Sequence, residues 1–484
     1  MLAPIDEIPE RVFETDVCIA GGGPAGITLA LALAKSGTNV VLLEGGGLAP
    51  PTPEEKSLYS GASSGRSYPL SMSRLRYFGG SSGHWGGWVR PLDKIDFARK
   101  PHIQHSGWPI DRSDMTEWYN QAHTWLEIPS SEYFEDQEPP FQEKLLSAKH
   151  GIVNRFFRFS PPTRYGSRYL EDVTSSKNLT CLLGANLTKL HTQNQKIESV
   201  TAVSLSGKEI EVRARYTVLA TGGIENARIL LNTAEHSKDA IGNHSDWLGR
   251  NFMDHPGWSP GRVISKSDLS YYRFDYDGVA AMPALGIADE VLMSEKTLNC
   301  CGFLHPVGFD KDIQKQYFRN PWFNELRGAE DIASYRLQLI FEPSPTRDSR
   351  LTLTNETDSL GIRKVDLHWA IDDSDFDMLA RSIDRITEFF GVSGSGRMKL
   401  LKPVNNETRK ARLGNGMHHM GTTRMSESAN DGVVDINCAV HGMENLYIAG
   451  SSVFPTAGFS NPTLTIVALS CRMAAHLTQK LDRS

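Results

Sequence analysis

The chain has 484 residues, which is long for one hydrophobic core and predicts two or three domains, consecutive or interleaved. It carries 51 Lys and Arg against 57 Asp and Glu, a formal net charge of −6, and the two signs are mixed along the chain. This balance excludes a strongly basic nucleic-acid binder and gives no electrostatic basis for an anionic membrane as partner.

The six cysteines are few for this length, and no two of them have the CxxC spacing of a zinc or redox motif. We expect free, buried thiols in a reducing compartment. No apolar stretch reaches the ~18 residues of a membrane span, and the first residues lack the basic-then-apolar order of a secretion signal. A cytoplasmic location is therefore expected, although export on a partner's signal would leave no trace here.

The first predicted unit is the stretch DVCIAGGGPAGITLALALAKSGTNVVLLE, a strand from Asp16, a glycine turn, an apolar helix and a second strand. The turn has GxGxxG spacing at Gly21, Gly23 and Gly26, and the second strand ends at Glu44. Such glycines permit a tight turn, backbone approach to a pyrophosphate and close packing of helix on strand, while the acid binds the ribose. The unit predicts a dinucleotide site, with a plain structural βαβ unit as the alternative.

A second glycine turn lies in ARYTVLATGGIENARILLNT, where a buried strand over 218–220 precedes Gly222 and Gly223. The segment NLYIAGSS ends in a further turn at Gly450. The first unit is common to NAD and FAD sites. Glycine turns from distant parts of one chain favour the larger FAD, although ordinary α/β turns have the same composition.

Two more elements are predicted towards the C-terminus. KVDLHWAI, residues 364–371, alternates apolar and polar residues as a half-buried strand does. In GFSNPTLTIVALSCRMAAHL, Asn461 and Pro462 stand before a long apolar helix, and Pro462 suits a first helical position. Such a helix start carries partial positive charge and free N–H donors, so it predicts something negative or polar opposite it.

With these segments the chain resembles the glucose-methanol-choline (GMC) family of FAD oxidoreductases, and within it the branch of pyranose 2-oxidase and bacterial sugar and gluconate dehydrogenases. The resemblance covers most of the chain and is weakest between residues 258 and 347. The motifs that carry it are AGGGPAG with Glu44, RYFGGSSGHWGGWVRPLDKIDF, GWPI, ATGGIENARILL, GRNFMDHPG, SRLTLTNE, HHMGTTRM and NLYIAGSSVFPTAGFSNPTLTIVAL.

The resemblance implies an α/β fold in which a Rossmann-like FAD-binding domain is interleaved with a substrate domain built on a mostly antiparallel sheet. We expect the FAD-binding domain to comprise residues 11–96, 160–255 and 412–484. Residues 97–159 and 256–411 are expected to form the substrate-binding domain.

The resemblance also assigns the chemistry, which is oxidation of an alcohol with hydride transfer to flavin N5. His418 in HHMGTTRM holds the position of the family's base, and Asn461 that of its partner. The helix start at Pro462, Thr463 and Leu464 would face the flavin pyrimidine edge and stabilise the charge that collects there. His419 is the alternative base, and without the family context His418 could be a core residue and Asn461 a helix cap.

Gly80, His84 and Trp85 lie in GGSSGHW, the frame in which pyranose 2-oxidase and some relatives bind FAD covalently through a histidine. His84 holds that position, and a histidine packed on the flavin without a bond would give the same sequence. The resemblance implies a structural role for His255 in NFMDHPG, so we interpret it as a core histidine. No spacing such as HExxH indicates a metal, and none is expected.

The favoured substrate is a sugar or glycoside oxidised at a ring secondary alcohol, with a primary or benzylic alcohol as the alternative. A flavin-containing lyase on the same fold is the alternative of another class. Oxygen, a quinone or a redox partner would reoxidise the flavin, and a homo-oligomer or a small companion subunit stays open. Aromatic residues occur in two stretches of the variable region, and they suit either a sugar ring or ordinary core packing: Tyr271, Tyr272, Phe274, Tyr276, Tyr317, Phe318, Trp322 and Phe323.

Overall fold

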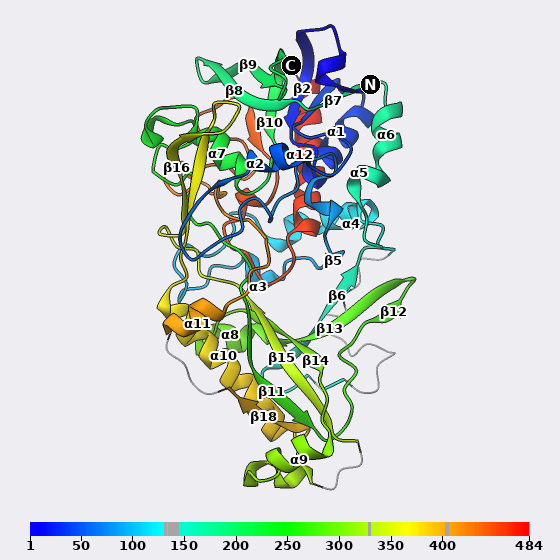
Figure 1. Cartoon of the computed structure of the whole chain (residues 1–484), viewed down its shortest axis with the longest axis vertical. Helices are drawn as coiled ribbons and strands as arrows, with labels where there is room; N and C mark the ends of the chain where they lie inside the picture. Colours follow the sequence, from blue (N-terminus) through cyan, green and yellow to red (C-terminus); the bar gives the residue numbers. More distant parts are fainter. Residues whose placement is uncertain (130–132, 134–144, 147, 328–330, 402–405, 484) are drawn as a thin grey trace.

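Two large sheets lie towards opposite ends of the long axis of the molecule (Figure 1). The structure is a computed structural model that describes residues 1–129, 133, 145–146, 148–327, 331–401 and 406–483. For Trp322 it describes the backbone alone. Among the described residues, no helix combines the length and the apolar composition that crossing a bilayer requires. All six cysteines are buried and unpaired, as expected.

The helices are distributed over the whole chain. The α-helices are α1 (Pro24–Lys35), α2 (Pro53–Ser57), α3 (Lys94–Phe97), α4 (Thr116–Trp125), α5 (Tyr165–Arg168), α6 (Leu170–Ser175), α7 (Glu225–Leu231), α8 (Asp289–Glu295), α9 (Lys311–Tyr317), α10 (Asp373–Val392), α11 (Asn406–Arg412) and α12 (Thr463–Asp482). The 3₁₀ turns are η1 (Ile5–Glu7), η2 (Gly80–Gly83), η3 (Arg112–Met115), η4 (Ser237–Asp239), η5 (Pro321–Leu326) and η6 (Ser451–Val453).

The first sheet joins the N-terminal unit to strands from the middle and the end of the chain. Its strands are β1 (Leu2–Pro4), β2 (Val12–Ala20), β3 (Val40–Glu44), β7 (Leu179–Leu183), β8 (Asn186–Gln193), β9 (Lys196–Val203), β10 (Glu209–Leu219) and β19 (Leu446–Ile448). The order is β1-β7-β3-β2-β10-β9-β8, with β19 paired to β10. The pairs from β1 to β10 and the pair with β19 are parallel, whereas β9 is antiparallel to β8 and β10.

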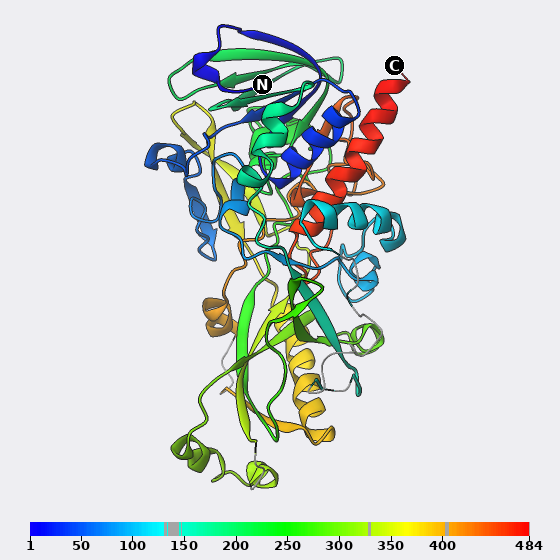
Figure 2. The ribbon, with the colours of Figure 1, turned by 90° about the vertical axis from the view of Figure 1, so that its right-hand side faces the viewer.

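The β2–α1–β3 unit has the Rossmann-like geometry predicted for it. Gly21, at φ +111°, turns the chain beside the end of β10, where a Cβ would overlap Ala220. A Cβ on Gly26 would overlap the carbonyl of Gly21, so both positions require glycine. Helix α1 packs on this sheet, and α12 packs alongside α1 (Figure 2).

The second sheet is antiparallel in every described pair, which agrees with the expected mostly antiparallel sheet. Its strands are β5 (Trp88–Val89), β6 (Ile152–Phe159), β11 (Gly257–Ser265), β12 (Phe274–Tyr276), β13 (Val279–Ile287), β14 (Cys300–Pro306), β15 (Ala333–Phe341) and β18 (Gly396–Leu400). The order is β18-β11-β15-β14-β13-β6-β5, with β12 beside β13.

The two faces of the second sheet bury different side chains because successive strand residues point to opposite faces. In β14, Cys300 and Leu304 belong to the main core, which also contains the apolar face of α10. Cys301 and Phe303 belong to a smaller cluster that includes Phe459 of the C-terminal segment. This second face therefore supports the loop that leads to Asn461.

A small third sheet has the order β16-β17-β4. Its strands are β4 (Gly61–Gly65), β16 (Arg350–Thr357) and β17 (Arg363–Trp369). Strand β17 confirms the predicted alternation, because Val365, Leu367 and Trp369 are buried whereas His368 is exposed.

The C-terminal helix agrees with its prediction except at its first residue. Pro462 is the N-cap and α12 begins at Thr463, one position later than expected, a difference within the usual variation of helix ends. The domain boundaries stay a prediction. Strand β5 lies within 11–96 yet pairs in the second sheet, and the third sheet joins strands from both predicted domains.

Candidate active site

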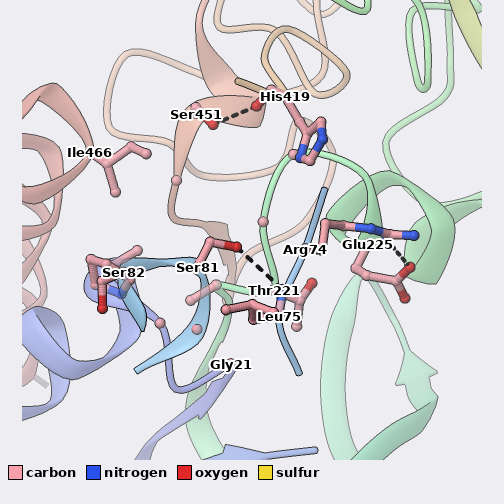
Figure 3. Close-up of a pocket in the computed structure, with 18 of the residues that line it drawn as sticks. Gly21, Arg74, Leu75, Ser81, Ser82, Thr221, Glu225, His419, Ser451 and Ile466 are labelled. Carbon is pink, nitrogen blue, oxygen red and sulfur yellow. Dashed lines mark hydrogen bonds and ion pairs between the residues drawn. The ribbon is translucent and has the colours of Figure 1, made fainter. Parts of the chain in front are cut away.

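A cavity of about 650 Å³ runs from the glycine turn after β2 to the start of α12 (Figure 3). This volume lies within the ~300–1,000 Å³ usual for ligand and cofactor sites. Its wall contains every residue predicted for the site except Gly26, which packs behind Gly21. These lining residues are Gly21, Gly23, Glu44, Gly80, His84, Trp85, Gly222, His418, Gly450, Asn461, Pro462 and Thr463.

The end of the cavity at β2 and β3 has the features of a nucleotide cradle. Glu44 Oε2 accepts the N–H of Gly22 at 2.8 Å and Oε1 accepts that of Gly46 at 2.7 Å, which fixes the carboxylate at the end of β3. Gly23 is the N-cap of α1, and a Cβ there would meet no atom within 4 Å. The helix start and the carboxylate therefore fit a pyrophosphate and a ribose, the groups that FAD presents.

Asn226 joins the second and third glycine turns. Its Oδ1 accepts the backbone N–H of Thr221 at 2.9 Å, and its Nδ2 donates to the carbonyl of Ala449 at 3.1 Å and to Ser452 Oγ at 3.0 Å. One buried amide thus holds the turns at Gly222 and Gly450 together. Sequence reasoning missed this residue, although it follows GGIE in the quoted motif.

Arg74 and Glu225 form a buried ion pair in the cavity wall, with Arg74 Nη1 2.6 Å from Glu225 Oε1 (Figure 3). Burial acts to raise the pKa of Glu225, but Arg228 and Arg74 hold it below its ordinary value. The guanidinium of Arg74 also lies over the Tyr59 ring at 4.0 Å. No local motif marks this pair, because its members lie far apart in the chain.

The GGSSGHW segment reaches the cavity through contact between two glycine turns. A Cβ on Gly80 would lie 3.1 Å from Gly23 Cα, so the segment lies directly on the nucleotide cradle. Burial and the charge of Arg164 lower the pKa of His84. Trp85 is anchored through Nε1, which donates to the carbonyl of Thr163 at 3.0 Å.

At the opposite end of the cavity the structure brings His418 and Asn461 together. Asn461 Nδ2 lies 3.3 Å from His418 Nε2, although 43 residues separate the two in sequence. Burial lowers the pKa of His418 to about 4. His418 Nδ1 lies 2.9 Å from His255 Nδ1, and the two rings are close to perpendicular at 80°.

His255 is buried, as expected of a core histidine, but its contact with His418 was not predicted. The carboxylate of Asp254 accepts the backbone N–H groups of His255 at 2.6 Å, His418 at 2.8 Å and Met417 at 3.1 Å, and the Tyr68 hydroxyl at 2.8 Å. One buried carboxylate therefore fixes both histidine segments. In the sequence, the adjacent Asp254 and His255 of NFMDHPG were the signal from which this contact could have been predicted.

His419, the alternative base, also lines the cavity. Its ring packs against Tyr68 at 5.5 Å and Phe252 at 6.1 Å, and its carbonyl accepts Ser451 Oγ at 2.6 Å. Burial, with the charge of Arg74, lowers its pKa well below the ordinary value. These contacts fix the ring of His419 in an aromatic cluster with Tyr68 and Phe252.

The two aromatic stretches that were considered for substrate binding lie outside the cavity wall. None of their described side chains lines the cavity, and Trp322 lies outside the described side chains. Tyr317 and Phe323 pack with Ile264 and Leu326 in a separate apolar cluster. The aromatic side chains in the cavity wall are instead Tyr59, Trp85 and Trp88.

Two family models match this chain. Residues 16–237 match the model described as FAD dependent oxidoreductase, and residues 345–470 match GMC oxidoreductase. These spans contain the nucleotide cradle and the His418–Asn461 contact.

Individual proteins are similar over different lengths. 2-Methyl-1,2-propanediol dehydrogenase of Mycolicibacterium austroafricanum is 23% identical over 97% of this chain and 96% of its own. C-glycoside 3-oxidase of Microbacterium trichothecenolyticum is 32% identical over 26% of this chain and 24% of its own. The crystal structure of pyridoxine 4-oxidase from Mesorbium loti has the same fold, with a TM-score of 0.56 and 18% identity over 96% of this chain and 99% of that one.

The nucleotide cradle and the family matches define an FAD-dependent oxidoreductase. More narrowly, the segment over residues 345–470, which contains His418 and Asn461, matches the GMC oxidoreductases.

Proposed function

We propose that the protein oxidises a ring secondary alcohol of a sugar or glycoside, with His418 as base and Asn461 as its partner. The 3.3 Å distance between His418 Nε2 and Asn461 Nδ2 at the cavity wall carries this proposal. A neutral imidazole nitrogen accepts a hydroxyl proton near neutral pH, and an amide beside it holds the substrate oxygen without titrating. The alternative base, His419, has no such partner at hand because its ring is held among Tyr68 and Phe252.

The proton and the electrons leave the alcohol by separate routes. The O–H bond breaks, and the proton passes to Nε2 of His418, which burial keeps neutral above a pKa of about 4. When bound, FAD would supply at N5 the acceptor for a hydride from the carbinol carbon. The alcohol would then become a carbonyl compound, and FAD would take up two electrons.

The start of α12 supports the same reaction electrostatically. The first bond of the helix runs from the Ile466 N–H to the Pro462 carbonyl, so the N–H groups of Thr463 and Leu464 precede the helical ladder. Such groups carry partial positive charge and favour an anion opposite them. We assign them to the negative charge that reduction leaves on the bound cofactor.

Trp88 supports a ring-shaped substrate. Its ring lines the cavity and is fixed from behind by Phe159 at 4.5 Å and Phe303 at 5.2 Å. A fixed indole face suits stacking by a sugar ring. The relative named C-glycoside 3-oxidase favours a glycoside, whereas the diol dehydrogenase keeps a smaller alcohol as the alternative.

Anaerobic flavin reduction tests the proposal. The purified holoprotein is mixed with D-glucose, methyl and phenyl β-D-glucosides, a C-glycoside, 2-methyl-1,2-propanediol, benzyl alcohol and pyridoxine while flavin absorbance is followed. We expect a sugar or glycoside to bleach the flavin fastest. Bleaching by a simple alcohol alone would replace the substrate class, and no bleaching of a loaded flavin by any alcohol would leave a lyase as the better assignment.

The His418→Ala variant tests the base. We expect it to retain FAD and to lose flavin reduction by about 10³-fold, within the range of general-base contributions. His244→Ala, which removes a histidine outside the cavity lining, is the control and should reduce at the wild-type rate. An unchanged rate in His418→Ala would reject His418 as the base.

The bond between His84 and FAD is a separate question that the same preparation answers. A lowered pKa keeps the His84 imidazole neutral and nucleophilic, which such a bond requires. If the bond forms, acid precipitation leaves the yellow colour with the protein, and His84→Ala releases it. Reoxidation of the reduced protein by oxygen or by a soluble quinone then identifies the acceptor class.

A further inference from the structure

His255 is the one polar side chain of the NFMDHPG segment that touches the ring of His418. The two Nδ1 atoms are 2.9 Å apart, a distance at which one proton lies between them. One ring must therefore donate and the other accept. Which ring donates decides where the lone pair of His418 lies.

The second contact of the His418 ring settles the direction. At Nε2 of His418 the neighbour is the amide nitrogen of Asn461, which donates and cannot accept. Nε2 must then carry the lone pair, and Nδ1 of His418 carries the proton. On the other ring, Nε2 of His255 has no hydrogen-bond partner among the described residues, so Nδ1 of His255 is the atom that accepts the proton from His418.

We propose that His255 is a positioning residue that accepts the Nδ1 proton of His418 and so holds the lone pair of His418 on Nε2, facing the substrate. This inference rests on the proposed role of His418 as the base. His255 itself does not touch the reacting atoms.

Asp254 makes this arrangement rigid. Its carboxylate accepts the backbone N–H groups of both His255 and His418, at 2.6 and 2.8 Å, so that the two rings are carried on segments tied to a single point. Tyr68 closes the cluster by donating its hydroxyl to Asp254 at 2.8 Å. Burial lowers the pKa of His255 to about 4 despite the nearby Asp254 carboxylate, so His255 is neutral and able to accept a proton near neutral pH.

The arrangement predicts a specific kinetic defect. Without an acceptor at the Nδ1 position of His255, His418 can place its proton on Nε2, where it blocks removal of the substrate proton. The fraction of His418 in the productive tautomer falls, whereas the affinity for the alcohol and for FAD does not depend on it. The limiting rate constant of flavin reduction should therefore fall without a matching change in the dissociation constant of the alcohol.

Three substitutions separate this role from packing. In His255→Asn the amide oxygen lies where Nδ1 was and can accept the same proton. In His255→Gln the amide lies one bond further from the backbone. His255→Leu keeps the volume of the side chain but has no acceptor. His123→Leu is the control, because it removes another buried histidine, bonded to Tyr119 and Tyr133 in the region of α4.

Each variant is purified with its FAD, and its FAD-to-protein ratio, thermal midpoint, limiting rate constant of reduction and alcohol dissociation constant are measured. The probe is the panel alcohol that reduces the wild-type flavin fastest. We expect about 100-fold slower reduction in His255→Leu and His255→Gln, recovery to within about 10-fold in His255→Asn, and a dissociation constant within threefold throughout. His123→Leu should lower the thermal midpoint and leave the rate constant unchanged.

Two outcomes would overturn the inference. Reduction by His255→Leu within threefold of wild type, while His418→Ala is inactive, would remove His255 and keep the base. Equal rates in His255→Asn and His255→Gln would also contradict it, and this comparison holds even if His255→Leu fails to fold. An active His418→Ala would instead reject the proposed function itself.

Discussion

Burial alone accounts for the low pKa of His418, about 4 against an ordinary value near 6.5. A base with a lowered pKa is neutral, and so active, above that pKa and is lost as pH falls through it. We therefore predict that the limiting rate constant of flavin reduction is constant between about pH 8 and 5.5 and declines only below about pH 5. Stopped-flow reduction across this range checks it.

A half-loss of rate near pH 6.5 would contradict that prediction, because it would mean that His418 titrates as an exposed histidine does. His419 gives no competing signal near pH 6.5, since burial and the charge of Arg74 hold its pKa well below the ordinary value. Buffers of constant ionic strength keep the screening of all other charges the same across the pH series.

At the scale of single residues, the sequence predicted those that a local motif marks. Glu44, His84, His418 and Asn461 all line the cavity because glycine turns and a helix start fix the backbone around them. Asn226, Arg74 and His255 were missed or given a structural role. Their contacts join segments that are distant in sequence, and such contacts leave no periodicity or spacing to detect.

At the scale of elements, Gly26 of α1, which packs behind the cavity wall, leads to a testable prediction. A Cβ on Gly26 would overlap the carbonyl of Gly21, so Gly26→Ala must push α1 away from the turn that faces the pyrophosphate. We predict that Gly26→Ala loses most of its FAD, measured as the flavin-to-protein absorbance ratio after gel filtration.

Gly391→Ala is the matched control, because Gly391 is also within a helix, α10, and a Cβ there would meet nothing within 4 Å. This variant should keep its FAD and gain about 0.5–1 kcal/mol of stability, since alanine lowers the entropy of the unfolded chain. Full FAD occupancy in Gly26→Ala would show that the turn tolerates displacement of the helix.

Elements with a strong pattern were predictable, and those defined by their partners were not. The alternation of Val365, Leu367 and Trp369 predicted β17, and the apolar run after Pro462 predicted α12. Strand β4, with the sequence GASSG, has no apolar pattern at all. It is a strand because β17 supplies its hydrogen-bonding partner from some 300 residues away, with Val365 paired to Gly61.

At the scale of the whole molecule, a buried ion pair joins the second sheet to the loop that leads to Asn461. Lys100 Nζ lies 3.0 Å from Glu342 Oε2, and their side chains are 0% and 2% exposed. Glu342 follows β15, and its Oε1 accepts the backbone N–H of Gly458 at 3.1 Å, three residues before Asn461. The position of Asn461 against His418 thus depends on a pair that no local motif in the sequence marks.

Removing one member of a buried pair leaves the other charge without compensation, at a cost of about 3–5 kcal/mol. We predict that Lys100→Met lowers the free energy of unfolding by that amount and also slows flavin reduction, because Glu342 no longer holds the Gly458 backbone in place. Urea unfolding and anaerobic reduction measure the two effects.

Lys315→Met is the control, because it removes a lysine that is paired with Asp312 on the surface. Their side chains are 74% and 91% exposed, and the variant should change neither stability nor the reduction rate, because exposed pairs contribute little. If Lys100→Met lost stability but reduced its flavin at the wild-type rate, the pair would support the sheet alone, and the loop that leads to Asn461 would be positioned without it.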